Sequence, residues 1–286
     1  DFTEHFDSGD GGADDGTFES PYTTLVTGAT SQPGREVNLL HGNSSFNNGG
    51  NNYQITSNQS LVSESAGNTA TISTDQGSVV LPEANPGAVT RGTITNGGVQ
   101  INSENVTIQN VSFNNAGIST ANGNTHKNLT ISNVSIVNPV PSIVSIQLGG
   151  ASNGTVEGAI TLENLTVAGG SGGIFIEDSS ANVNIIASNV NVNGGGTVMH
   201  LGDLDGSFTF TNVDLANSES PILDIDGGTI GGTMDASSSI NNGGAGGDFV
   251  NIYGGNTGTI TSAASFTDAS GRGFNFDNAD GNYAFS

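Results

Sequence analysis

The sequence predicts an all-β protein folded as a right-handed parallel β-helix, a solenoid with three short strands in each coil of about 24 residues. Three observations lead to this prediction. Short stretches of alternating apolar and polar residues recur along the chain, whereas helical periodicity is nearly absent. A six-residue phrase with Asn at its third position returns at spacings of 23, 31, 25 and 23 residues. Gly, Asn and Asp separate the apolar stretches, which is typical of turns.

The repeated phrase supplies two strands of each coil. Its Asn residues are Asn110, Asn133, Asn164, Asn189 and Asn212. The two strands lie so close in sequence that the chain must bend sharply, and Asn tolerates the left-handed backbone conformation that such a bend requires. Side-chain amides in neighbouring coils can also bond to one another. We therefore predict that these five residues form an internal Asn ladder.

A second apolar phrase follows each Asn after roughly a dozen residues, as in Ile174-Phe-Ile176 and Met199-His-Leu201. A third strand then leads back to the Asn phrase, as in Gly206-Ser-Phe208-Thr-Phe210. Stacked coils place equivalent residues about 4.8 Å apart. A β-propeller is the main alternative, but its blades need about 40 residues and antiparallel hairpins, which neither the period nor the turns fit.

The two ends of the chain differ from its middle. Residues 1–36 are expected to form an N-terminal segment and cap, with a short capped helix over Ser20–Val26. Residues 37–286 are expected to form the β-helix as a single domain, with irregular early coils that include Ile72 and Val79. The last coil, residues 273–286, has neither an amphipathic helix nor a charged blocker. We expect either a longer parent chain or another subunit to cover it.

Several segments of the first hundred or so residues carry a family resemblance. They are Asp14-Asp-Gly-Thr17, Ser20-Pro-Tyr-Thr-Thr-Leu25, residues 48–55, and Val99-Gln-Ile101 running into Asn105-Val-Thr-Ile-Gln-Asn110. Together with the Asn coils behind them, they resemble bacterial cell-surface and secreted right-handed parallel β-helix proteins, such as adhesins and autotransporter passengers. The resemblance implies this fold and export from the cell. It implies no particular activity, because one fold serves many functions.

Charge and composition exclude several functions. The 286 residues include 27 acidic and 4 basic side chains, for a formal net charge of −23. The four basic residues lie far apart in the sequence, so we expect neither nucleic acid nor an anionic membrane surface as a partner. No cysteine is present, which excludes thiol chemistry and is compatible with export. No apolar stretch is long enough for membrane insertion. Because the first residue is Asp, we expect a processed or excised chain.

The second apolar phrase places two columns of side chains on the outer face of one sheet. The first column is Gln147, Phe175, His200, Asp224, Asn251 and Asn275, and the second is Gly149, Glu177, Gly202, Asp226, Tyr253 and Asp277. Neighbours in a column are expected about 5 Å apart, so His200 and Asp224 would pair. Asp226 would lie roughly 10 Å from Glu177, near the carboxylate separation of inverting glycosidases. With Phe175 and Tyr253 as stacking faces, this is the candidate site for a neutral glycan.

A structural role for these carboxylates is favoured over a catalytic one. Acidic residues at strand ends commonly cap turns. Pectate lyase and polygalacturonase chemistry is not expected, because no Arg or Lys lies on that sheet and a net charge of −23 repels polyuronates.

Hard oxygen donors crowd both ends of the chain and suit Ca²⁺. The candidate metal ligands are Asp7, Asp10, Asp14, Asp15, Asp277 and Asp280. Neither segment completes an EF-hand or nonapeptide pattern, so we expect no required cofactor and treat Ca²⁺ as a candidate ligand. His5, His41 and His126 stand alone in the sequence and are expected to be exposed.

Three Asn-X-Ser/Thr sequons, at Asn43, Asn58 and Asn153, lie in expected loops, where a suitable host would be able to attach a glycan.

The leading hypothesis is a non-enzymatic structural or adhesive β-helix, exported to the cell surface or the medium. Its expected partners are identical subunits, through head-to-tail stacking into a filament or strand addition by residues 1–6, and glycans or cell-surface receptors. The alternative is a protein that binds or hydrolyses a polysaccharide at the acidic site on the outer face.

Overall fold

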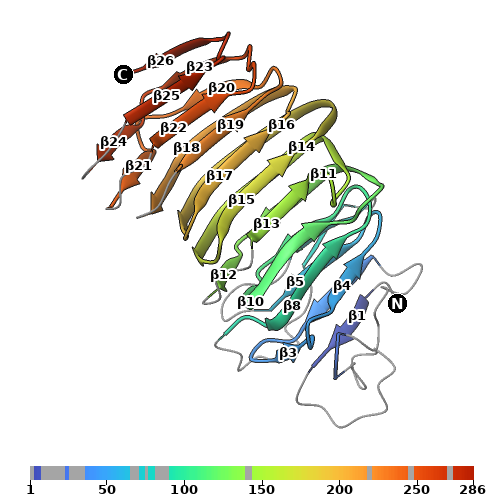
Figure 1. Cartoon of the computed structure of the whole chain (residues 1–286). Helices are drawn as coiled ribbons and strands as arrows, with labels where there is room; N and C mark the ends of the chain where they lie inside the picture. The colour runs from blue at the N-terminus through green and yellow to red at the C-terminus, as the bar shows by residue number, and fades with distance from the viewer. Residues whose placement is uncertain are drawn as a thin grey trace.

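The computed structural model of the chain describes residues 3–7, 23–25, 36–64, 71–74, 77–80, 90–138, 144–217, 221–243, 248–268 and 273–286. These residues contain no helix, and 24 strands join in one continuous sheet. All pairings between those 24 strands are parallel. Figure 1 shows successive coils stacked along one axis, with β1 towards one end and β26 at the other. The predicted all-β parallel β-helix is confirmed.

The solenoid has three faces, which we call the first, second and third face. The first face contains the strands that precede the Asn bend and their equivalents. They are β1 (Thr3–Phe6), β2 (Val37–Leu40), β5 (Ser60–Ser63), β9 (Thr107–Gln109), β11 (Thr125–Ser132), β14 (Thr155–Gly169), β16 (Ser179–Asn193), β18 (Gly206–Asn217), β20 (Gly231–Met234), β23 (Thr259–Ser262) and β26 (Asn282–Phe285).

The second face follows the bend. It contains β3 (Ser45–Asn47), the first parts of β8 (Thr93–Ile101) and β10 (Ser112–Thr120), β12 (Ser135–Asn138), the last parts of β14, β16 and β18, β21 (Ser239–Asn242) and β24 (Ser265–Asp268). The third face contains β4 (Asn52–Ile55), the last parts of β8 and β10, β13 (Val144–Gly149), β15 (Gly172–Glu177), β17 (Thr197–Gly202), β19 (Leu223–Asp226), β22 (Asp248–Tyr253) and β25 (Gly273–Asp277).

The core is a stack of apolar rows. Side chains alternate between the two sides of a strand, so every second residue points into the solenoid. Ile108, Ile131 and Leu162 occupy equivalent register positions in three coils, and all three are fully buried. Burial of each such side chain contributes about 1.5–3 kcal/mol. One apolar cluster continues in this way from Phe6 to Ala264.

The Asn bends have the predicted backbone conformation, but the predicted position of the ladder is wrong. Each ladder residue has a positive φ, between 52° and 59°. Nδ2 of Asn189 donates to Oδ1 of Asn164 at 2.9 Å, and Nδ2 of Asn212 donates to Oδ1 of Asn189 at 2.8 Å. These three side chains are exposed, whereas Asn110 is buried. The ladder is external there because the apolar residue after each Asn, such as Val190, takes the inward position.

Two further Asn ladders were not anticipated. In one, Nδ2 of Asn105 donates to Oδ1 of Asn58 and Nδ2 of Asn128 donates to Oδ1 of Asn105, both at 2.9 Å. In the other, Nδ2 of Asn115 donates to Oδ1 of Asn96 at 2.9 Å. All five residues have a positive φ. Asn58 is therefore a ladder member as well as a sequon.

The N-terminal segment takes part in the solenoid. β1 pairs in parallel with β2, in the register Thr3↔Val37 to Phe6↔Leu40, and Phe6 is buried in the core. The predicted arm thus adds a strand to its own chain. Of the expected helix over Ser20–Val26, residues 23–25 are described, and Leu25 is buried in the core.

The early coils contain an insertion. β6 (Thr71–Thr74) and β7 (Gly77–Val80) form an antiparallel hairpin outside the continuous sheet. β5 pairs directly with β9 across this insertion, in the register Ser60↔Thr107. The prediction that Ile72 and Val79 lie in solenoid coils is therefore wrong, since a period-two pattern does not distinguish a hairpin from a coil. No helix in the described part of the chain is long and apolar enough to cross a membrane.

Candidate functional site

The third face carries both predicted columns. The strand register aligns Gln147 with Phe175, Phe175 with His200, and His200 with Asp224, and then continues through Asn251 to Asn275. The second column aligns in the same way, from Gly149 to Asp277. The sequence predicted these columns correctly because a parallel register fixes which side chains become neighbours.

The imidazole of His200 contacts two carboxylates, Glu177 in the preceding coil and Asp224 in the following coil. Its Nδ1 lies 2.8 Å from Oδ2 of Asp224, and its Nε2 lies 3.3 Å from Oε1 of Glu177. Gly202 leaves room for the ring, since a Cβ at this position would lie 2.5 Å from Nε2. Burial by itself would lower the pKa of His200, but the hydrogen bonds to Asp224 and Glu177 outweigh it and raise the pKa to about 9. His200 is therefore a cation at neutral pH.

Both carboxylates have further partners. Asp224 is buried, with 6% of its surface exposed, and accepts hydrogen bonds from Nδ2 of Asn251 at 2.8 Å and from the hydroxyl of Tyr253 at 3.2 Å. Nε2 of Gln147 donates to Oε2 of Glu177. The hydrogen bond from His200, followed by others, holds the pKa of Glu177 below its ordinary value. Each acidic group is thus satisfied by its neighbours.

A second set of carboxylates lies at the end of the third-face strands. Burial, followed by the nearby charge of Asp203, raises the pKa of Asp226. Burial also raises the pKa of Asp178, and the charges of Asp203 and Glu177 add to the effect. Asp178 and Asp203 both occupy left-handed turns, with φ of 56° and 49°.

This geometry disfavours hydrolysis between Glu177 and Asp226. In the register Gly202 lies between them, and the imidazole of His200 packs against Gly202. An inverting mechanism needs a water molecule and a sugar ring between the two carboxyl groups, and here a protonated imidazole occupies part of that space. A cationic His200 is also unable to accept a proton as a general base. The hydrogen bonds and ion pairs of this cluster connect neighbouring coils, which favours a structural role.

The two predicted stacking residues are both half-buried. The ring of Phe175 lies 5.4 Å from the His200 ring at an angle of 52°, and a Cβ at Gly172 would lie 2.8 Å from the Phe175 ring. Tyr253 directs its hydroxyl to Asp224. Part of each ring therefore already packs against the protein, and part remains open to the outer face.

The histidines were predicted wrongly. His41 is only 5% exposed. Its Nε2 lies 3.1 Å from Nδ1 of His5, and its Nδ1 lies 3.5 Å from Oδ2 of Asp7. His126 is fully buried, and its ring nitrogens face the backbone oxygens of Ala121 at 2.9 Å and Ser103 at 3.3 Å. His126 is out of step with the alternation of Leu129 and Ile131, because the register shifts between Lys127 and Leu129. It is instead the register neighbour of the buried Val156, a contact that the sequence pattern does not indicate.

The candidate metal ligands form no group of three or more in the described part of the chain. Asp7 lies beside His41 and accepts a hydrogen bond from Oγ of Ser44 at 2.9 Å, and Asp277 and Asp280 are exposed in the last coil. Asp10, Asp14 and Asp15 lie outside the described residues. No group of three or more acidic, His or Cys side chains arranged to hold a metal occurs among the residues that the structure describes.

Comparison of the chain with models of protein families, with characterised proteins and with solved structures finds no match. The fold therefore defines the class: the chain is a parallel β-helix, or β-solenoid. External ladders of Asn distinguish its surface. So does the hydrogen-bonded cluster of Glu177, His200 and Asp224 on the third face, which we call the acidic column.

Proposed function

We propose that this protein is an extracellular structural or adhesive β-helix without catalytic activity, which assembles end to end through its last coil. The observation that carries the proposal is the open face of that coil. Phe274 and Phe276 are 37% and 46% exposed, whereas their register partners Val250 and Ile252 in the preceding coil are fully buried. These two rings occupy inward positions, so a further coil stacked on them would bury them.

Five aromatic side chains of the last three strands, β24, β25 and β26, pack together at this end. They are Phe266, Phe274, Phe276, Tyr283 and Phe285, with ring centroids of neighbouring pairs 4.6 to 6.3 Å apart. Large apolar rings exposed together favour association, since burying them removes apolar area from water.

Both ends of the described solenoid present terminal strands on all three faces. On the first face, β26 and β1 each pair on one side only within the described residues. The same is true of β24 and β3 on the second face and of β25 and β4 on the third. Stacking β26 on β1 of a second copy would continue the first face with parallel pairing. Because β1 and β26 each extend one coil beyond the other two faces, two rungs would remain to be filled on the second and third faces. Such a head-to-tail contact does not close on itself and generates a filament.

Electron microscopy by negative staining and sedimentation velocity test the assembly. We expect wild-type protein to form rods of several chain lengths, and the double variant Phe274→Asn with Phe276→Asn to remain monomeric. The matched control is Val137→Asn with Ile186→Asn, because these residues are 48% and 40% exposed on the sides of the solenoid. The control should assemble like wild type. A wild-type protein that stays monomeric at high concentration would refute the proposal.

A second candidate function is the binding of a neutral glycan on the third face. The specific observation is that Phe175 and Tyr253 lie with amide and carboxylate groups on one outer face. A hydrolysis screen on neutral glycans separates binding from catalysis, and we expect no hydrolysis. If hydrolysis were detected and Asp224→Asn or Asp226→Asn abolished it, the non-catalytic proposal would be wrong.

We propose that folding requires no cofactor. Thermal unfolding with Ca²⁺ and with EDTA tests whether the acidic residues at the two ends hold this ion, because a ligand of the folded state raises the melting temperature. Asp277→Asn with Asp280→Asn serves as the comparison for the C-terminal end.

A further inference from the structure

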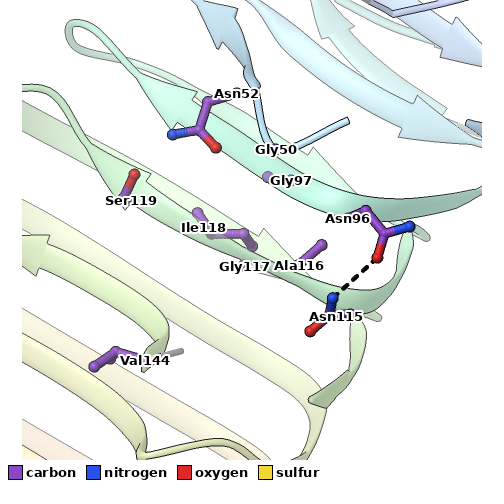
Figure 2. Close-up of a pocket in the computed structure, with 11 residues that line it drawn as sticks. Gly50, Asn52, Asn96, Gly97, Asn115, Ala116, Gly117, Ile118, Ser119 and Val144 are labelled. Carbon is purple, nitrogen blue, oxygen red and sulfur yellow. Dashed lines mark hydrogen bonds between the residues drawn. The ribbon is translucent and has the colours of Figure 1, made fainter. Parts of the chain in front are cut away.

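A hollow of 380 Å³ lies on the third face over β8 and β10, away from the acidic column (Figure 2). Its floor includes Gly97, Gly98 and Gly117. A Cβ at Gly98 would lie 2.4 Å from the backbone oxygen of Gly117, and one at Gly97 would lie 2.3 Å from the oxygen of Asn51. These positions exclude any side chain, so the floor is bare backbone.

Polar groups surround this floor. In Figure 2, Asn52 and Ser119 lie towards one side of the glycines, and the hydrogen-bonded pair Asn96 and Asn115 lies towards the other. Neither Asn52 nor Ser119 makes a side-chain hydrogen bond within the part of the chain that the structure describes. Oδ1 of Asn115 also lacks a partner among these residues, but it is shielded from solvent, so Asn52 and Ser119 are the side chains open to a ligand. The hollow therefore offers donors and acceptors that the protein itself leaves unused.

The hollow continues into the first column of the third face. Ser119 is the register neighbour of Gln147, and Gln147 is the neighbour of Phe175. Two steps between coils place Phe175 about 10 Å from Ser119 along the solenoid axis. Along the solenoid axis, the hollow is therefore followed by the side-chain amide of Gln147 and then by the half-buried ring of Phe175.

The absence of charge among the described residues that line the hollow, together with the negative charge of the whole protein, favours a neutral ligand. No described residue that lines the hollow is charged, and the protein carries a net charge of −23, which repels anions. Unpaired amide and hydroxyl groups match a ligand rich in hydroxyls, and a few placed polar groups in a concave site are typical of small-molecule recognition. A floor without side chains lets a flat ring approach closely, and Phe175 offers a face for a second ring.

We propose that this hollow binds one end of a neutral oligosaccharide, whose chain then runs along the solenoid axis over Gln147 to Phe175. The inference rests on the second candidate function, glycan binding on the third face, and places the principal contact at Gly117 and Ser119, distant from His200. The acidic column then serves stability, and the hollow serves recognition.

Isothermal titration calorimetry with four neutral hexasaccharides, cellohexaose, laminarihexaose, maltohexaose and N-acetylchitohexaose, tests the proposal, with hexagalacturonate as the anionic comparison. We expect at least one neutral ligand to bind and the anion not to bind. Ser119→Phe, which fills the hollow, and Asn52→Ala should each weaken binding by about tenfold or more. Phe175→Ala should weaken binding of the hexasaccharide more than that of the corresponding disaccharide.

The matched controls are Ser112→Phe and Asn114→Ala, which make the same changes on the second face of the same coil region. Both should bind like wild type, and circular dichroism confirms that each variant is folded. The inference is overturned if no neutral hexasaccharide binds, or if Ser119→Phe binds like wild type. If Tyr253→Ala abolishes binding while Ser119→Phe does not, glycan binding on the third face stands and the hollow is not its site. None of these outcomes affects the proposed end-to-end assembly, which is tested separately by the length of the rods seen in electron microscopy.

Discussion

At the scale of single residues, His200 connects three coils of the third face. Both of its ring nitrogens contact carboxylates, one from the coil before and one from the coil after. Its side chain is 13% exposed, so solvent screens these contacts only partly. A buried charge with two opposite partners is expensive to break, because removing one group leaves the others unpaired.

The stability of the protein should fall at alkaline pH because of His200. A pKa of about 9 in the folded state lies above the ordinary value of 6.5, so the folded state favours the protonated ring. The resulting stabilisation is complete below about pH 6.5 and is lost as the pH rises through 9. The shift corresponds to about 3 kcal/mol. Urea unfolding from pH 6 to 10 measures it.

Two variants complete the alkaline test. His200→Gln should remove the loss of stability between pH 6.5 and 9, since its amide does not titrate. Gly202→Ala places a Cβ against Nε2 and should reduce the loss by displacing the ring from Glu177. An unchanged pH profile in His200→Gln would show that another group causes the effect.

At the scale of the element, the Asn bends and their ladders define each corner of the solenoid. A residue such as Asn189 satisfies two needs at once, because it adopts a φ of 53° and bonds to the Asn residues of both neighbouring coils. Glycine meets only the first need, and most other residues meet neither. This combination explains why Asn recurs at the bend with the period of the coil.

Substitution at Asn189 should separate the two contributions. Asn189→Ala loses both the left-handed preference and the two hydrogen bonds, and should lower the free energy of unfolding by about 2 kcal/mol. Asn189→Gly keeps the bend and should lose about 1 kcal/mol. Asn193→Ala, at an exposed position of the same strand, is the control and should change stability by less than about 0.5 kcal/mol. Equal losses for Ala and Gly would contradict a role for backbone conformation.

At the scale of the whole molecule, charge opposes the fold and stacking supports it. The net charge is −23, and among the described residues Lys127 with Glu157 is the only ion pair that involves Lys or Arg. Attraction between surface charges therefore contributes little, while repulsion between carboxylates acts over the whole surface. The continuous apolar core and the parallel ladders supply the stability.

Salt should therefore stabilise the protein. Raising NaCl from about 10 mM to about 500 mM shortens the Debye length from about 30 Å to a few ångströms and screens the repulsion between carboxylates. We expect the melting temperature to rise, as measured by differential scanning calorimetry. KCl should have the same effect at equal ionic strength, which distinguishes screening from binding of a particular cation. A melting temperature that falls with salt would show that attractive ion pairs dominate.

Much of the architecture was predictable from the sequence. The repeat period predicted the length of a coil, and the position of Asn predicted the left-handed bends. The alternation within the second apolar phrase predicted both columns of the third face, including the contact between His200 and Asp224. These features follow from local conformation or from a repeat that one chain segment shares with the next.

The tertiary structure alone decided which way the bends face, where the hairpin leaves the solenoid, and what the ends of the chain contact. The ladder at Asn164 is external because Leu165 takes the inward position. His41 is buried where the pairing of β1 with β2 brings His5 and Asp7 beside it. The hollow over Gly98 and Gly117 exists because glycines distant in sequence become neighbours in adjacent coils. The sequence by itself determined the repeat and its register, since these depend on the order of residues within one coil. Contacts between segments without a repeat depend on the complete fold, and they shape the surfaces through which we propose that the protein acts.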